Sequence, residues 1–188
     1  MNSIKIDEHI LLDPLRTEDA AEIFHTINTQ RSYLGPWLPF VALTQELSDT
    51  QAFVASVVDA PEESREPIFV IRYQGQFAGI VGFLNTDRQN RKTEIGYWLS
   101  EPFQRKGLMS RSVKALLQWA FVTMELNRVQ IRCATGNTPS LNVPRRLGFH
   151  FEGIERAGEL LSSGKYADLE VYSMLRDEFM AKDPSTDQ

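Results

Sequence analysis

A single glycine, Gly107, lies where a strand-like segment gives way to a helix-like one. The strand-like segment is residues 93–99, and the helix-like segment runs from Leu108 to about Met124. Glycine lets a ligand approach the backbone closely, and the first N–H groups of a helix have no partner inside the helix. With the helix dipole, such groups bind anions. Residues 104–110 therefore predict a phosphate or pyrophosphate site, with a plain turn as the alternative.

The bulk properties and the missing motifs narrow the class of protein. The chain of 188 residues has a formal net charge of −5 and one cysteine, Cys133. The negative charge argues against non-specific nucleic-acid binding, and the single cysteine excludes an internal disulfide and fits a reducing cytoplasm. Neither G-x-x-x-x-G-K-[ST] nor G-x-G-x-x-G occurs, which argues against a nucleotide triphosphate P-loop and a Rossmann site. No signal peptide or membrane-spanning apolar run is present.

A second group of residues follows the strand-like run 129–134. Asn137 and Ser140 are three residues apart, Pro139 stands at a favoured first position of a helix, and residues 147–149 read Leu-Gly-Phe. A capped short helix with a glycine stop accounts for most of these residues without any ligand.

Together, the two segments resemble the GNAT superfamily of acetyl-CoA-dependent N-acetyltransferases. The family pattern Q/R-x-x-G-x-G/A is matched by Gln104 and Gly107, and N-x-x-S/A followed by L-G-F is matched by Asn137, Ser140 and residues 147–149. Further segments resemble the RimJ/RimL-like branch, which acetylates the N-termini of ribosomal proteins. They comprise Trp37-Leu38-Pro39, Gly158-Glu159 and Tyr166-x-Asp168.

The resemblance covers roughly residues 8–178 and implies an α/β (α+β) GNAT fold, with a mixed sheet of about seven strands and about four helices. We expect one domain over residues 1–180 and a polar tail over 181–188. The expected strands are residues 10–12, 68–73, 77–84, 93–99, 129–134, 149–155 and 166–175. Helices are expected after an N-cap at Thr17, from Thr44 or Ser48, over 108–124 and after Thr138. Residues 31–40 are expected to form an ordered loop, and Asn127 a left-handed cap.

Two residues depart from the family pattern. Met109 replaces the usual glycine or alanine, which still permits pyrophosphate binding if its side chain points into the core. Pro144 replaces the tyrosine that protonates the departing CoA thiolate in many members. A proline inside a helix removes an N–H, so the carbonyl of Ser140 should be freed and the helix bent.

The resemblance implies acetyl-CoA as co-substrate. The backbone of residues 105–110 should hold the pyrophosphate, with Arg105, Lys106 and Arg111 adding charge unless they only form a solvated basic face. The pantetheine arm should run along residues 97–99 like an added strand, and an N–H near Leu99 should stabilise the oxyanion. The residues implied in cofactor binding are Tyr97, Trp98, Leu99, Gln104, Arg105, Lys106, Gly107, Leu108, Met109, Ser110 and Asn137.

Glu159 and Ser140 are the catalytic candidates that the resemblance supplies. Glu159 would act as the base, or is a surface carboxylate in a polar turn. Ser140 would give a proton to the thiolate, or is a hydroxyl that bonds the backbone at a helix start. An α-amine has a pKa of about 7.7–8.0, so about 10% of it is neutral at pH 7 and a mild base suffices.

Trp37, Tyr166 and Asp168 are the candidates for acceptor binding, and Tyr97 could also line that pocket. Packing explains each of them as well. Cys133 permits an acyl-cysteine route in principle, but a small core residue is the more ordinary role of a buried cysteine. The three histidines lack metal-ligand spacing to one another, so no metal is expected.

The leading hypothesis is a cytoplasmic N-acetyltransferase that acts directly on a protein N-terminus, with no nucleic-acid or membrane partner. The family also allows a homodimer. Two alternatives stay open: acetylation of a small amine such as a polyamine or an amino sugar, and a catalytically silent CoA- or peptide-binding module.

Overall fold

A mixed eight-stranded sheet forms the frame of the computed structural model, which describes residues 1–182. The strands lie side by side in the order β1-β2-β3-β4-β5-β6-β8-β7, and every neighbouring pair is antiparallel except β5 and β6. Their bounds are β1 Ile4–Lys5, β2 Ile10–Pro14, β3 Ile68–Tyr73, β4 Gln76–Asp87, β5 Lys92–Leu99, β6 Arg128–Ala134, β7 His150–Leu160 and β8 Tyr166–Leu175.

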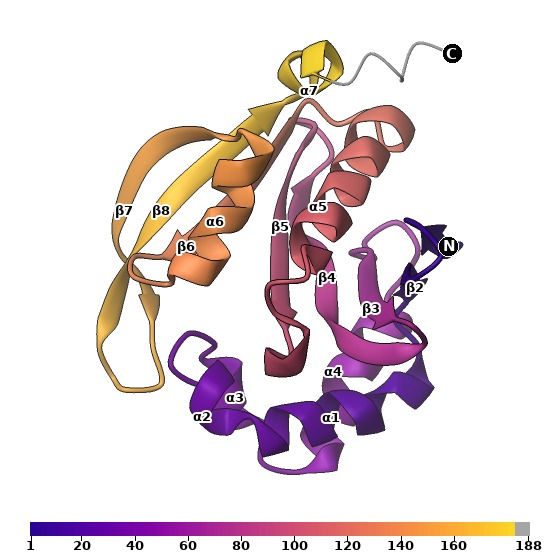
Figure 1. Ribbon diagram of the computed structural model, residues 1–188, viewed down its shortest axis with the longest axis vertical. Coiled ribbons are helices and arrows are strands. Elements are labelled where there is room, and N and C mark those ends of the chain that lie inside the picture. The colour runs from indigo at the N-terminus through magenta and orange to yellow at the C-terminus, as the bar shows by residue number, and fades with distance from the viewer. Residues whose placement is uncertain (183–188) are drawn as a thin grey trace.

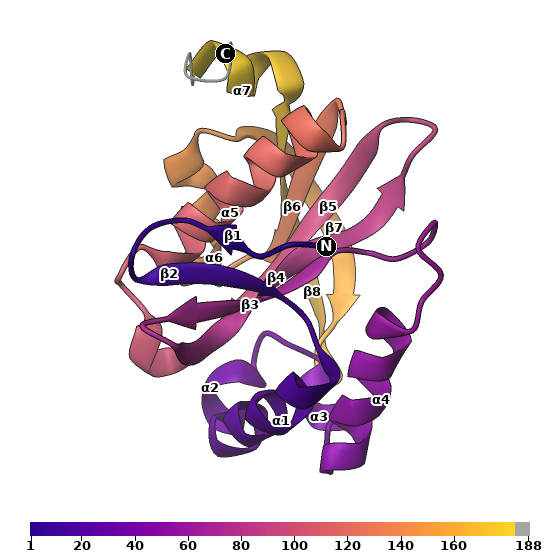
Figure 2. The same cartoon turned by 90° about the vertical axis from the view of Figure 1, so that its right-hand side faces the viewer.

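The helices lie in two groups on either side of the sheet (Figure 1, Figure 2). One group, α1 to α4, gathers at the lower end in Figure 1, whereas α5 and α6 run along the other face and α7 lies near the C-terminus. The bounds are α1 Ala20–Thr29, α2 Arg31–Leu34, α3 Phe40–Leu43, α4 Leu47–Val58, α5 Leu108–Gln118, α6 Thr138–Leu147 and α7 Arg176–Lys182, with single turns η1 Thr17–Asp19, η2 Glu101–Phe103 and η3 Trp119–Thr123.

The alternation of side chains along the strands produces two separate apolar cores. On β5, Ile95 belongs to the core beneath α5 and α6, whereas Trp98 packs into the core beneath α1 and α4. The apolar stripe of α5 is fully buried in the larger core, where Leu116 is inaccessible to solvent. The helix that follows Gly107 is therefore held rigidly against the sheet.

The sheet opens between β5 and β6. These parallel strands pair only over residues 92–94 and 128–130, whereas β5 stays paired with β4 as far as Leu99. In the described structure, residues 95–99 thus have no strand partner on the β6 side. The N–H of Ser100 donates to the Ala78 carbonyl and so points toward β4. Successive backbone N–H groups of a strand point alternately to its two sides. The N–H groups of Tyr97 and Leu99 consequently point into the gap.

Several expectations from the sequence are confirmed and others are wrong in detail. The GNAT-type mixed sheet is present, with β1 as an additional strand and with α2, α3 and α7 as additional helices. Residues 31–40 contain α2 and the start of α3 instead of forming a loop, because proline is compatible with a helix start. Part of the expected tail, residues 181–182, belongs to α7, and 183–188 lie outside the described residues.

Two expected caps are also wrong. The N–H of Arg16 bonds to the carboxylate of Asp19 at 2.8 Å, so Asp19, not Thr17, organises the entry to α1. After η3 the left-handed residue is Glu125, at φ 53°, not Asn127, whose N–H donates to the Arg91 carbonyl at 2.7 Å. Within residues 1–182, no helix is long and apolar enough to cross a membrane.

Candidate active site

The turn at Gly107 has the conformation that only glycine adopts at little cost. Gly107 has φ 72° and caps α5, and its carbonyl accepts the first helical bond, from Arg111 N–H at 3.1 Å. The N–H groups of Leu108, Met109 and Ser110 precede that bond and lack a helical partner. A Cβ built on Gly107 would meet nothing within 4 Å, so open space faces the turn. The loop fits the anion site expected from the sequence.

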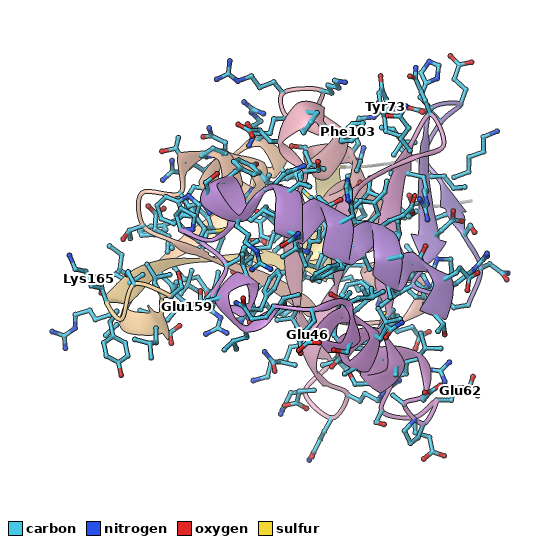
Figure 3. All side chains as sticks on the ribbon, turned by 90° about the horizontal axis from the view of Figure 1, so that it is seen from below. Glu46, Glu62, Tyr73, Phe103, Glu159 and Lys165 are labelled. Carbon is cyan, nitrogen blue, oxygen red and sulfur yellow. The ribbon has the colours of Figure 1, made fainter. Side chains whose placement is uncertain are left out.

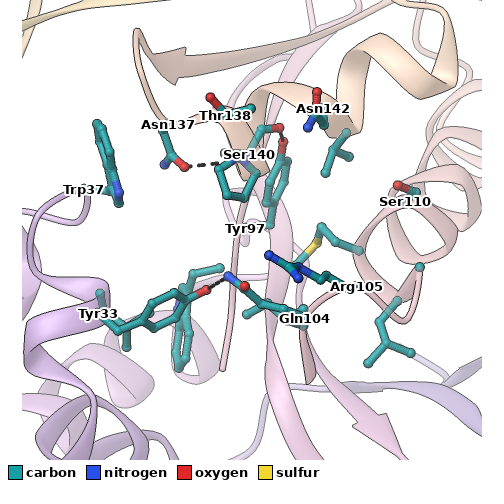
Figure 4. A pocket seen from close by; sticks show the side chains of 18 of the residues that line it. Tyr33, Trp37, Tyr97, Gln104, Arg105, Ser110, Asn137, Thr138, Ser140 and Asn142 are labelled. Carbon is teal, nitrogen blue, oxygen red and sulfur yellow. Dashed lines mark hydrogen bonds between the residues drawn. The ribbon is translucent and has the colours of Figure 1, made fainter. Parts of the chain in front are cut away.

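A cavity of about 680 Å³ joins this turn to the free edge of β5 and the start of α6 (Figure 4). Its lining includes most of the residues expected to bind the cofactor or act on it: Tyr97, Trp98, Leu99, Gln104, Arg105, Gly107, Leu108, Met109, Ser110, Asn137 and Ser140. Trp37, expected on the acceptor side, also lines it. Further lining residues, to which the sequence analysis assigned no role in the site, are Tyr33, Leu34, Leu38, Thr138, Pro139, Asn142, Val143 and Arg146.

The basic residues near the turn separate into two groups. Arg105 and Arg146 line the cavity. Lys106 instead lies over the rings of Tyr73 and Phe103, with its Nζ 5.1 Å and 5.3 Å from their centroids. Arg111 forms an ion pair with Asp7. The positive charge available to an anion therefore comes from two chain segments, the turn before α5 and α6.

Arg146 could have been found from helical periodicity. Pro139, Asn142 and Arg146 are spaced three and four residues apart, so they lie on one face of α6, and all three line the cavity. The two-residue motif of Asn137 and Ser140 indicates only the start of this helix.

Met109 is buried in the core, although it also lines the cavity. Its side chain packs in the larger core and is 7% exposed. The core therefore accommodates the substitution of the family's small residue.

Pro144 has the predicted effect on the Ser140 carbonyl. Because Pro144 lacks an N–H, that carbonyl has no donor four residues further along α6, and the hydroxyl of Tyr97 donates to it at 2.9 Å. The helix continues from Thr138 to Leu147 without interruption. The bend in this helix remains a prediction.

The side chain of Ser140 lies beside the buried thiol of Cys133. The two atoms, Oγ and Sγ, are 3.2 Å apart, and Cys133 is 6% exposed. Burial raises the pKa of Cys133, so the group stays a neutral thiol rather than a nucleophilic thiolate. The cavity is lined by Ser140 and not by Cys133, which disfavours the acyl-cysteine route.

Glu159, Tyr166 and Asp168 lie outside the cavity lining, on the β7–β8 hairpin. Figure 3, seen from below, places Glu159 near Lys165 on this hairpin, well away from Tyr73 and Phe103. Tyr166 is 67% exposed, and the carboxylate of Asp168 accepts the N–H of Ala157 at 2.8 Å. The hairpin nevertheless approaches the other side of the site, since Ser162 Oγ donates to the carbonyl of Gly35.

The carboxyl of Glu159 is half-buried near other charged groups. Burial raises the pKa of Glu159, Arg132 opposes the rise, and Glu94 adds to it. Arg132 is itself paired with Glu94 at 3.0 Å and with Glu155 at 3.1 Å. Glu94 is a buried carboxylate that the sequence did not single out, and its partners satisfy it.

The chain matches known acetyltransferases along nearly its whole length. The relative named "Putative ribosomal N-acetyltransferase YdaF", from Bacillus subtilis (strain 168), is 34% identical over 95% of this chain and 98% of its own. Spermidine N(1)-acetyltransferase of Escherichia coli (strain K12) is 26% identical over 92% and 89%. A solved RimL ribosomal L7/L12 alpha-N-protein acetyltransferase, in complex with coenzyme A, superimposes with a TM-score of 0.88, at 25% identity and over 94% and 99% of the two chains.

The family profile described as Acetyltransferase (GNAT) domain matches residues 9–150. These residues contain the Gly107 turn, the free edge of β5 and the whole of α6. The chain belongs to the GNAT acetyltransferase family and is an N-acetyltransferase.

Proposed function

We propose that this enzyme transfers an acetyl group from acetyl-CoA directly to the N-terminal α-amine of a ribosomal protein in the cytoplasm. The observation that carries the proposal is the single cavity in which the unpaired helix N–H groups after Gly107 adjoin the free edge of β5. The names of the similar proteins YdaF and RimL support the acceptor class.

The cavity offers different binding groups to two chemically different parts of the cofactor. The pyrophosphate binds the N–H groups of residues 105–110, with Arg105 and Arg146 supplying charge from both walls. The pantetheine arm lies along residues 97–99 and bonds the backbone groups that face the gap. Gln104 and Asn137 border this path, and Lys106 contributes only its backbone, since its ammonium group lies over two rings.

The transfer requires an attack by a neutral amine on the thioester carbonyl carbon. As the C–N bond forms, negative charge develops on the carbonyl oxygen, and the N–H of Leu99 is directed into the gap to stabilise it. The C–S bond then breaks, and the thiolate takes a proton. Ser140 lines the cavity and passes this proton to the sulfur, and its hydroxyl regains a proton from the protonated nitrogen of the tetrahedral intermediate, while the neighbouring Cys133 stays protonated.

The acceptor enters on the side formed by α2 and the β7–β8 hairpin. Trp37 lines the cavity there, and Tyr166 and Asp168 lie further out on the hairpin, where a peptide rather than a single amine can reach them. Glu159 is the base, acting through water because it does not line the cavity. The raised pKa of its carboxyl brings it closer to the pKa of the amine.

The test is a mass-spectrometric assay with acetyl-CoA and a panel of acceptors. The panel contains ribosomal protein L7/L12, a peptide with the same N-terminus, the same peptide with a blocked α-amine, and spermidine. We expect acetylation of the protein and the free peptide, and none of the blocked peptide. Acetylation of a lysine in the blocked peptide would contradict the proposed acceptor.

The similarity to spermidine N(1)-acetyltransferase favours a small polyamine as the second candidate acceptor. Turnover of spermidine, with no peptide acetylated, would support it. Binding of acetyl-CoA with no acetylated product from any acceptor would instead indicate a silent binding module.

A further inference from the structure

The start of α6 is fastened to the sheet by a contact that exists because of Pro144. A helix residue normally accepts a hydrogen bond from the N–H four residues ahead. Pro144 removes this donor, and the hydroxyl of Tyr97 on β5 takes its place at 2.9 Å from the Ser140 carbonyl oxygen. The partly buried carbonyl thereby accepts a hydrogen bond from a side chain of another element.

Three contacts converge on Ser140. Its carbonyl accepts from Tyr97, its N–H donates to the side chain of Asn137 at 3.4 Å, and its Oγ lies 3.2 Å from the Cys133 thiol. Asn137 belongs to the same helix start, whereas Tyr97 and Cys133 belong to β5 and β6. Of these three contacts, the bond from Tyr97 is therefore the one that joins α6 to the free edge of β5. Figure 4 shows Tyr97 between Ser140 and the Gln104–Arg105 side of the cavity.

We propose that Tyr97 is a positioning residue. Its hydroxyl replaces the backbone donor that Pro144 removes, and it thereby holds the first turn of α6, with the Ser140 hydroxyl, against the free edge of β5. The proposal rests on the proposed function, in which Ser140 acts beside that edge. The positioning role depends on the hydroxyl of Tyr97, whereas a role in cofactor contact alone would depend on its ring.

A direct catalytic role for the Tyr97 hydroxyl is the competing explanation. Its hydrogen is already committed to the Ser140 carbonyl, and burial raises the pKa of Tyr97 well above its usual value. Both facts favour a hydroxyl that keeps its proton and serves as a structural donor.

A double-mutant cycle separates the two explanations. Tyr97→Phe removes the donor and leaves the Ser140 carbonyl unpaired, whereas Pro144→Ala supplies an N–H that can bond this carbonyl within the helix. We expect Tyr97→Phe to lower kcat by about 10- to 100-fold and to leave the Kd for acetyl-CoA within about twofold, because the pyrophosphate turn is untouched. Its Tm should fall by about 2–10 °C.

The decisive result is the rescue. In the Tyr97→Phe/Pro144→Ala double variant, both kcat and Tm should return most of the way to the values of Pro144→Ala alone. Tyr33→Phe is the matched control, since it also removes a hydroxyl from the cavity wall but one that bonds Gln104. Pro144→Ala should not rescue its effect.

Two results would overturn the proposal. A rescue of Tm without a rescue of kcat would assign the Tyr97 hydroxyl to the reaction itself, and additive effects on both quantities would mean that Tyr97 and Pro144 are not coupled. The Tm cycle needs no acceptor. If the wild-type enzyme acetylates nothing, the proposed function fails, while the Tm cycle still decides whether Tyr97 holds the Ser140 carbonyl.

Discussion

The two sides of the cavity are built in different ways. On the cofactor side, the phosphate turn consists of consecutive backbone groups after Gly107, on a helix packed against the sheet. On the acceptor side, Trp37 from the segment after α2 faces the start of α6, and the β7–β8 hairpin reaches the same segment through the hydrogen bond from Ser162 to Gly35. The first side depends on local conformation, and the second on contacts between distant segments.

This difference predicts where variation is tolerated. Backbone N–H groups bind a phosphate whatever the side chains are, so the turn accepts Met109 in place of a small residue. The acceptor side is made of side chains, so its substitutions should change which amine is used without changing acetyl-CoA binding. Each prediction below tests one part of this division.

The largest effect should come from Gly107→Glu. The new carboxylate would lie at the mouth of the pyrophosphate site, where two like charges about 4 Å apart repel by about 4 kcal/mol near a protein surface. We expect the Kd for acetyl-CoA, measured by calorimetry, to rise at least about 100-fold. A thermal shift with acetyl-CoA should be absent for the variant and present for the wild type.

Gly107→Ala is the control for backbone strain. An alanine in the left-handed conformation costs about 1–2 kcal/mol but adds no charge. It should lower Tm and retain most acetyl-CoA binding. Equal loss of binding in both variants would assign the effect to the conformation of the turn and not to the anion.

The next largest effect on acetyl-CoA binding is expected for one of two basic residues near the turn and not for the other. Arg146→Ala removes a charge that lines the cavity, whereas Lys106→Ala removes one that lies over Tyr73 and Phe103. Charge-assisted hydrogen bonds are worth about 1.5–3 kcal/mol, so the first variant should raise the Kd for acetyl-CoA at least about tenfold. The second should change it less than about threefold. Equal effects would mean that only the overall charge matters.

Most of the residues expected to bind the cofactor line the cavity, whereas of the three acceptor candidates only Trp37 does, and there is a physical reason for this difference. A strand, a glycine and a helix are neighbours in the chain, so their motif already specifies their geometry. The capture of the Ser140 carbonyl by Tyr97 joins residues 43 positions apart, and no local pattern indicates it. Likewise, Pro36 and Pro39 suggested a loop, but the surrounding segment packs Leu34 and Val41 into the smaller core as short helices.

On the acceptor side, Trp37→Ala should affect the acceptor and spare the cofactor. Trp37 lines the cavity near Gly136 and is partly buried. Removing a large aromatic contact should raise the KM for the acceptor by about tenfold, while the Kd for acetyl-CoA changes less than about twofold. Steady-state kinetics with calorimetry on the same sample would measure both. A matching rise in the acetyl-CoA Kd would mean that the two sides are not independent.

The smallest effect should come from Glu159→Gln, and it should depend on pH. About 10% of an α-amine is already neutral at pH 7, so a base can raise the rate by at most about tenfold there. As the pH rises above the amine pKa of about 8, the amine loses its proton unaided and the ratio of wild-type to variant kcat/KM should approach one. As the pH falls through the raised pKa of Glu159, the carboxylate is protonated and the ratio should again approach one.

The ratio should therefore be largest between these two pKa values. Glu155→Gln is the matched control, because it removes a carboxylate from the same strand that pairs with Arg132 at 3.1 Å. It should give a ratio that does not vary in this way with pH. A Glu159→Gln ratio that is constant across the range would exclude Glu159 as the base, and water alone would then receive the proton of the amine.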